Sequence, residues 1–108
     1  MELTIEDKIY LNELFDFYGA LLTEKQRTYF SYYYLDDYSL AEIANLTDVS
    51  RSAVLDQLQI AIGHLKNYET VLGLHSKHQK RLKLLEQLKN TNDLAVQAAL
   101  IDELEKTE

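Results

Sequence analysis

The 108-residue sequence contains no cysteine, no proline and only three glycines. Without cysteine, neither a disulfide framework nor a thiolate zinc site can form, which agrees with a reducing compartment. The scarcity of proline and glycine argues against folds with many tight turns and favours long helices. No stretch approaches the ~18 apolar residues of a membrane span, so we expect no membrane insertion. The first eight residues lack a basic region followed by an apolar run, so we expect no secretory signal and a cytoplasmic location.

The net charge of −7 argues against indiscriminate binding to polyanions, because phosphate contacts require clustered lysine and arginine. Residues 1–50 contain ten acids and three bases, and residues 51–72 balance at zero. Residues 73–90 contain five bases and one acid, whereas residues 91–108 contain five acids and one base. The basic stretch consists of Lys77, Lys80, Arg81, Lys83 and Lys89. We interpret it as a solvated face. Two alternatives stay open. The stretch could attract RNA, DNA or an acidic protein surface. It could instead pair with the acidic last helix, within the chain or in a dimer, through Asp102, Glu103 and Glu105.

Capping signals predict six helices. Thr23 with Gln26 and Ser39 with Glu42 match the capping-box pattern, in which two side chains satisfy the first free backbone N–H groups. Gly19 and Gly73 stand where helices would stop. With apolar periodicity, these signals predict helices over residues 5–18, 24–35, 40–46, 51–72, 74–89 and 94–104. We therefore expect an all-α protein with a helix-turn-helix domain over residues 1–72 and a C-terminal helical hairpin over residues 73–108.

The helix-turn-helix is predicted from about Thr23 to Lys66. Two short capped helices joined by the turn at residues 47–49 must cross steeply for their apolar faces to meet. We expect the joint to be filled by Ile43, Ala44, Leu46, Val49, Val54 and Leu58. If Val54, Leu58, Ile62 and Leu65 face inward, the outward face consists of Arg51, Ser52, Leu55, Asp56 and Gln59.

The candidate nucleic-acid-binding residues follow from that face. Arg51, in the first turn of the second helix, could reach a phosphate or a guanine edge. Ser52, Leu55 and Gln59 are the other candidate base readers. Residues expected near the DNA backbone are Thr23, Lys25, Gln26, Arg27 and Ser39.

Other features predict packing rather than chemistry. Phe30, Tyr33 and Tyr34 are expected to form a core against the first helix, opposite Phe15, Phe17 and Tyr18, while Tyr32 could anchor a partner. His75 and His78 have a spacing that can bind a metal, but we interpret them as partly exposed histidines without one. No glycine-rich phosphate loop, G-x-S-x-G motif or cysteine nucleophile occurs, so we expect neither catalysis nor a cofactor.

The run LTEKQR…YYLDDYSLAEIANLTDVSRSAV resembles the fourth conserved region of bacterial sigma factors, which binds the promoter −35 element. More closely, NELFDFYGALLTEKQRTYFSYYYLDDYSLAEIA…VSRSAV is similar to the YlxM family of small helix-turn-helix proteins. The similarity covers Asn12 to about Leu58, and the charged helical tail agrees in length and character. The resemblance implies a regulatory role in the signal recognition particle pathway. Relatives commonly carry a tyrosine or a basic residue where this sequence has Leu55 and Gln59.

Two hypotheses of different class follow. The first is a non-catalytic regulatory protein that binds duplex DNA and acts in the signal recognition particle pathway. The second is a protein-interaction module without DNA binding, which binds the particle's protein or RNA, or a second copy of itself. The stripe of Leu82, Leu85 and Leu88 would suit either a hairpin within the chain or the seam of a homodimer.

Overall fold

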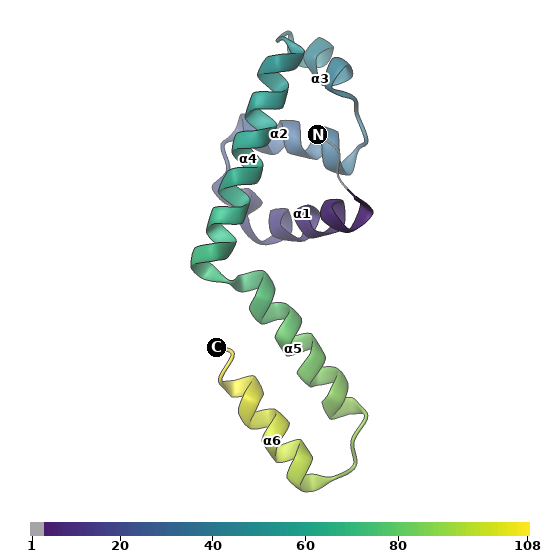
Figure 1. Ribbon diagram of the computed structural model, residues 1–108, viewed down its shortest axis with the longest axis vertical. Helices are drawn as coiled ribbons and strands as arrows, with labels where there is room; N and C mark the ends of the chain where they lie inside the picture. The colour runs from purple at the N-terminus through teal and green to yellow at the C-terminus, as the bar shows by residue number, and fades with distance from the viewer. Residues whose placement is uncertain (1–3) are drawn as a thin grey trace. The chain divides into compact units, whose positions relative to one another are not determined.

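The computed structural model describes residues 4–108, and all regular structure in this part of the chain is helical. The all-α class predicted from the sequence is therefore confirmed. The described residues form six α-helices, labelled in Figure 1, with the following bounds: α1 Ile5–Tyr18, α2 Glu24–Phe30, α3 Leu40–Thr47, α4 Arg51–Leu72, α5 Leu74–Lys89 and α6 Leu94–Glu105. A short 3-10 turn, η1 (Gly19–Leu21), follows α1, and a π-helical segment, η2 (Ser31–Leu35), follows α2.

The chain divides into two compact units, the first ending at Leu72 and the second spanning Gly73–Glu108. Gly73 adopts a left-handed conformation with φ +63°, which glycine accepts without steric cost and which ends α4. Within the described residues, no helix is long and apolar enough to cross a membrane.

Side-chain caps determine where the helices begin. Both predicted capping boxes are present: Thr23 Oγ1 accepts from Gln26 N at 3.2 Å, and Ser39 Oγ accepts from Glu42 N at 3.1 Å. Thr4 forms a third box with Asp7 at the start of α1. Ser50 Oγ accepts from Ala53 N at 3.1 Å and so caps α4. These local bonds confirm the predicted starting points of α2, α3 and α4.

Three helix ends differ from expectation. Gly19 has a right-handed helical backbone conformation (φ −56°), and its N–H donates to Phe15 O as in a continuing helix. It therefore begins η1 and does not end α1 with a left-handed cap. The helix that follows Thr23 reaches Leu35 as predicted, but its last turn widens, with Asp36 N bonding to Ser31 O at 3.0 Å. α3 includes Thr47, so the turn begins at Asp48, which takes the left-handed conformation.

The core of the first unit lies where α1, α2 and α3 pack on α4. Its largest fully buried side chains are Leu14, Tyr18, Phe30, Ile43, Val54, Leu58 and Leu65. The rings of Phe15 and Phe30 stack with centroids 4.5 Å apart, and Phe30 also contacts Tyr34. This bears out the predicted burial of Tyr18, Phe30 and Tyr34, which contribute large apolar areas to the core.

Some core expectations were wrong. Phe17 is 37% exposed, because it lies off the stripe of α1 formed by Leu11, Leu14 and Tyr18. Leu46, expected in the joint of the helix-turn-helix, is 61% exposed. Tyr33 is only half-buried, whereas Tyr29 is buried without having been expected.

The second unit is a hairpin of α5 and α6 (Figure 1). Arg81 Nε donates to Thr107 Oγ1 at 2.8 Å, and Arg81 Nη2 donates to the carbonyl oxygen of Thr107. Leu84 and Leu88 follow Arg81 on the same side of α5 and are half-buried.

The predicted leucine stripe of α5 needs correction, and one of the two pairings left open for the basic stretch, that within the chain, is not observed among the described residues. Leu82 and Leu85 are 46% and 42% exposed, so only Leu88 of the stripe lies on the seam. Within the chain, Asp102 and Glu103 pair with Lys106, the residue that directly follows α6, at 3.3 and 3.5 Å, rather than with the basic stretch.

Candidate nucleic-acid interface

The joint between α3 and α4 positions the candidate interface. Asp48 turns the chain with φ +56°, and its N–H and that of Val49 both donate to Ala44 O. Ile43 and Val54 lie on either side of the turn and are fully buried. The short turn and the apolar joint hold the two helices at a steep crossing, as in a helix-turn-helix. The first turn of α4 therefore projects from the fold on a rigid support.

The structure brings together three of the four predicted base-reading residues. Arg51, Ser52 and Leu55 line one hollow of about 360 Å³, together with Leu40 of α3. Arg51 and Ser52 are exposed, while Leu55 is half-buried. Gln59 is exposed one turn beyond Leu55 and so extends the same face. The side chains at this end of α4 are placed to meet a ligand as a group.

Leu40 was missed in the sequence. It directly follows the capping Ser39, and it lies three residues before Ile43 and four before Ala44, which are both buried. That spacing extends the inward stripe of α3 to its first turn, where the stripe meets the start of α4. The same periodicity that predicted the joint could have found this residue.

The predicted backbone-contacting residues divide into two kinds. Gln26 is 7% exposed, and its Oε1 accepts from Thr23 N at 3.2 Å, so its side chain is held within the fold. Ser39 is exposed, and its hydroxyl caps α3. Lys25 is exposed, with its ammonium 5.9 Å from the centroid of the Tyr29 ring, a cation–π distance. Ser39 and Lys25 remain accessible, whereas Gln26 does not.

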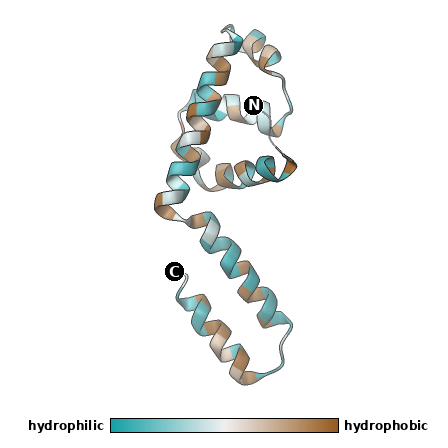
Figure 2. Cartoon of the chain, viewed as in Figure 1, coloured by the Kyte–Doolittle hydropathy of each residue, from teal (hydrophilic) through white to brown (hydrophobic). Residues whose placement is uncertain are grey.

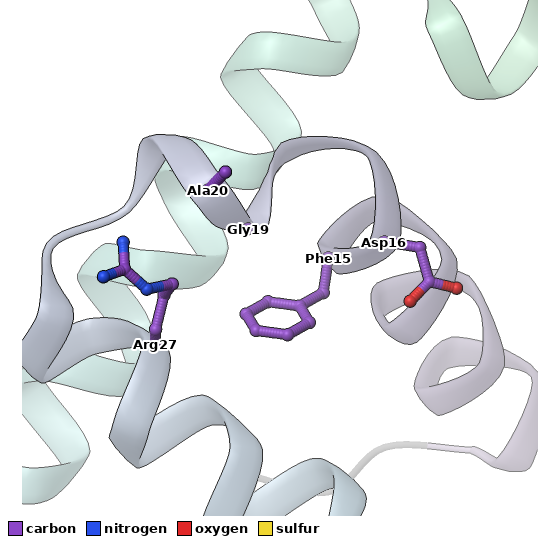
Figure 3. A pocket seen from close by; sticks show the side chains of 5 residues that line it. All are labelled: Phe15, Asp16, Gly19, Ala20 and Arg27. Atoms are coloured by element: carbon purple, nitrogen blue, oxygen red, sulfur yellow. The ribbon is translucent and has the colours of Figure 1, made fainter.

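Arg27 lies in a second hollow, of about 580 Å³, which it lines with Phe15, Asp16, Gly19 and Ala20. Figure 3 shows its guanidinium on one side, the ring of Phe15 in the middle and the carboxylate of Asp16 on the far side. Arg27 Nη1 donates to Leu22 O at 2.7 Å, which fixes the side chain against the end of η1. The structure thus separates the hollow of Arg27 from that of Arg51.

Acidic residues surround the candidate interface. Glu42, Asp48 and Asp56 are all exposed on α3, the turn and α4. The bases of α4 are Arg51 and Lys66, which are fifteen residues, or about 22 Å, apart along the helix. α4 therefore has no row of basic side chains that could follow a DNA phosphate backbone, and Arg51 is an isolated positive charge on this helix.

The described residues contain no group of three or more histidine, aspartate or glutamate side chains that could hold a metal ion. His75 is half-buried and His78 is exposed, both on α5.

The fold and the projecting end of α4 define a helix-turn-helix protein. Residues 5–106 match the model of the UPF0122 family, described as "Putative helix-turn-helix protein, YlxM / p13 like", and the chain belongs to that family. The resemblance to the YlxM family expected from the sequence is confirmed. The family is described by its helix-turn-helix, which is the motif that the fold of residues 40–72 presents.

Three relatives align with 80–94% of this chain. A UPF0122 protein of Shouchella clausii (strain KSM-K16) is 49% identical over 106 residues, which span 94% of this chain and 97% of the relative. A UPF0122 protein of Halalkalibacterium halodurans is 51% identical over 89 residues, or 82% of each chain. One from Geobacillus sp. (strain WCH70) is 52% identical over 86 residues, which span 80% of this chain and 78% of the relative.

Proposed function

We propose that this protein is a non-catalytic regulator that binds duplex DNA through the first turns of α4. The observation that carries the proposal is the grouping of Arg51, Ser52 and Leu55 around one hollow at the exposed start of the second helix. In helix-turn-helix proteins, that end of the second helix enters the major groove and contacts base edges. The family resemblance supports placing this regulation in the signal recognition particle pathway.

The side chains have chemically distinct roles in this proposal. The guanidinium of Arg51 can donate to the O6 and N7 atoms of guanine, and Gln59 can form a bidentate pair with adenine. Leu55 offers an apolar contact for a thymine methyl group, and the Ser52 hydroxyl can bond to either kind of base. The proposed backbone contacts come from Lys25, Arg27 and Ser39, whose polar groups would position the duplex without reading its sequence.

The test begins with selection, because the target sequence is unknown. The purified chain is incubated with fragmented genomic DNA at one fixed low salt concentration, and the retained fragments are sequenced. A shared motif is expected among them. A duplex carrying that motif then serves as the probe for affinity by fluorescence anisotropy. Retention without any shared motif, or no retention, would overturn the proposal.

Two alanine variants locate the binding face. Arg51→Ala should weaken binding by roughly tenfold or more, since a base contact contributes about 1–3 kcal/mol. Lys66→Ala removes the same charge from the same helix about 22 Å away, and it should change the affinity by less than about threefold. Equal effects of the two substitutions would show that α4 does not read the duplex with its first turns.

A second candidate function is favoured by the acidic surroundings of this face. Glu42, Asp48 and Asp56 would repel phosphates but attract a basic protein surface, such as that of an RNA-binding protein. In this version the chain binds a component of the signal recognition particle. The deciding experiment offers the particle's protein, its RNA and random duplex DNA at the same salt concentration. Binding to the protein, with none to the RNA or to DNA, would favour this candidate over the first.

A further inference from the structure

The hairpin of α5 and α6 has almost no interior. Across Gly73–Glu108, Thr107 is the one buried residue, and no hydrophobic side chain is buried. A unit of this length rarely stabilises itself, because chains below about 40 residues bury too little apolar surface and usually need oligomerisation, disulfides or metals. Disulfides are excluded by the lack of cysteine. The hairpin therefore needs a further surface to pack against.

Most of the large exposed apolar side chains of the hairpin lie on one face. On α5, Arg81, Leu84 and Leu88 mark the side that faces α6, and on α6 that side is marked by half-buried positions that include Leu100 and Leu104. Each residue advances about 100° around a helix. Leu82 and Leu85 then lie to one flank of α5, and Leu94, Ala98 and Ile101 lie to one flank of α6.

α5 and α6 run in opposite directions. In two antiparallel helices, side chains that are displaced in the same rotational sense from the seam lie on the same side of the pair, so the two flanks form one surface. We name it the hairpin face: Leu82, Leu85, Leu94, Ala98 and Ile101. Their exposed fractions are 46% for Leu82, 42% for Leu85, 80% for Leu94 and 46% for Ile101. Hydrophobic positions recur along both helices in Figure 2. Val96, 44% exposed, lies on the opposite flank and gives an internal control.

We propose that the hairpin face is covered by the same face of a second copy of this chain, so that two hairpins form a four-helix bundle. The charge pattern supports this occupant. Residues 73–90 carry five bases and one acid, and residues 91–108 carry five acids and one base. A hairpin with one basic and one acidic helix is complementary to its own copy, as a two-fold interface requires.

Charge also selects between the two possible two-fold arrangements. If the two-fold axis is parallel to the helices, α5 of one copy packs on α6 of the other. Both contacts between the copies then join a basic helix to an acidic one. If the axis runs across the helices, α5 lies over α5 and α6 over α6, which sets like charges together. Packed helix axes are about 8–10 Å apart, which is comparable to the screening length in physiological salt. The electrostatic energies of the two arrangements therefore differ even at physiological salt. The axis therefore runs along the helices.

The oligomeric state of the full chain tests the proposal. Sedimentation equilibrium should show a dimer for the wild type. Ile101→Glu should raise the dimer dissociation constant by at least about a hundredfold, and Leu94→Glu by about tenfold. Val96→Glu, in the same turn of α6 as Leu94, should leave it within about threefold. A monomeric wild type, or equal weakening by Val96→Glu and Ile101→Glu, would overturn the proposal.

Loss of folding can be distinguished from loss of association. Leu94 is the first residue of α6 and is 80% exposed, so a glutamate there removes little packing and suits the positive end of the helix. The far-ultraviolet circular dichroism of the Leu94→Glu variant should match that of the Val96→Glu variant at equal concentration. A dimer that survives Leu94→Glu and Ile101→Glu combined would contradict this face as the interface.

The direction of the axis has its own measurement. The sequence lacks cysteine, so Asn92→Cys, in the exposed loop between α5 and α6, places a single spin label on each copy. With the axis along the helices, both loops lie at one end of the bundle. The distance between labels should then be shorter than α5, whose 16 residues span about 24 Å. A longer distance would place the loops at opposite ends and overturn the arrangement.

Discussion

The hydroxyl of Tyr18, the last residue of α1, donates a hydrogen bond of 2.7 Å to Oε1 of Glu69, near the end of α4. Tyr18 is 1% exposed, and its ring also contacts Tyr68, with centroids 5.9 Å apart. The bond joins residues 51 positions apart in the sequence. It connects α1 to the end of α4 that lies away from the candidate interface.

Removing this hydroxyl should destabilise the first unit. For Tyr18→Phe we expect the free energy of unfolding in urea to fall by about 1.5–3 kcal/mol, the range for a hydrogen bond to a charged group. Glu69→Gln keeps an oxygen acceptor at the same place and should cost less than half as much. If both substitutions changed stability equally, the bond could not be the cause.

The two glycines of the first unit should respond to alanine in opposite ways. A β-carbon on Gly19 would lie 2.9 Å from Cε2 of Phe15, whose ring is held by stacking on Phe30. We expect Gly19→Ala to lower the unfolding free energy by about 1–2 kcal/mol, as overpacking does. Gly63, inside α4, has open space around its added β-carbon, so Gly63→Ala should stabilise by about 0.5–1 kcal/mol.

Thermal unfolding of these variants separates crowding from helix propensity. Phe15→Leu should reduce the penalty of Gly19→Ala in the double variant, because the smaller side chain leaves room. An undiminished penalty in that double variant would contradict crowding by the Phe15 ring.

The left-handed turn residue of the helix-turn-helix offers a stabilising substitution. Asp48 has φ +56° and ψ 45°, a conformation that strains most residues but not glycine. We expect Asp48→Gly to raise the unfolding free energy by about 0.5–1 kcal/mol, whereas Asp48→Val should lower it by more than that. The measurement is the urea midpoint at constant m-value. A stabilising Asp48→Val would refute the left-handed conformation at this turn.

Tyr34 makes stability depend on alkaline pH. Its hydroxyl is buried and finds no hydrogen-bond partner among the described residues. Burial, with a smaller contribution from Tyr33, raises the pKa of Tyr34 from 10.0 to about 12. Below pH 10 the phenol is neutral in both the folded and the unfolded chain. Above pH 10 the unfolded chain ionises first, so folding stability is lost as the pH rises toward about 12.

The phenylalanine variant isolates this effect. Tyr34→Phe removes a buried unpaired hydroxyl and should stabilise the protein by about 1 kcal/mol at pH 7. Its advantage over the wild type should grow between pH 10 and pH 12, because the variant lacks the shifted group. Denaturant unfolding at pH 7, 9 and 11 measures the difference. An advantage that stays constant over this range would contradict the raised pKa.

If the chain binds duplex DNA as proposed, the salt dependence should be shallow. The proposed cationic contacts are Lys25 and Arg27 at the DNA backbone and Arg51 in the groove, so no more than about three phosphates are neutralised by each bound copy. The logarithm of the binding constant should then fall with the logarithm of salt concentration with a slope no steeper than about −3 per copy. A slope near −6 or steeper per copy would require the lysines of α5 to contact DNA as well, and anisotropy titrations at four salt concentrations measure it.

Helix starts were the most predictable feature of the fold. The boxes at Thr23 and Ser39 involve side chains and backbone groups only three residues apart, so the sequence pattern contains the whole interaction. The projecting position of Arg51 followed from the same reasoning, because the cap at Ser50 and the inward Val54 determine which side of α4 faces out.

Exposure at the edges of helices was less predictable. Three leucines that fit apolar stripes, Leu46, Leu82 and Leu85, remain 42–61% exposed. The sequence pattern indicates which side of a helix is apolar, but it does not indicate how much of that side the neighbouring helix covers. Arg27 was grouped with Lys25 by position near the start of α2, yet it is tied to the Leu22 carbonyl in a hollow of its own.

The sequence by itself determined the all-α class, the starts of the helices and the family, because caps, periodicity and motif residues act over a few positions in the chain. Only the tertiary structure decided that Arg51, Ser52 and Leu55 share a hollow with Leu40 and that Arg27 does not. It also decided which leucines of α5 lie on the hairpin seam. These outcomes depend on the crossing of helices and on burial between distant residues, which local patterns do not encode.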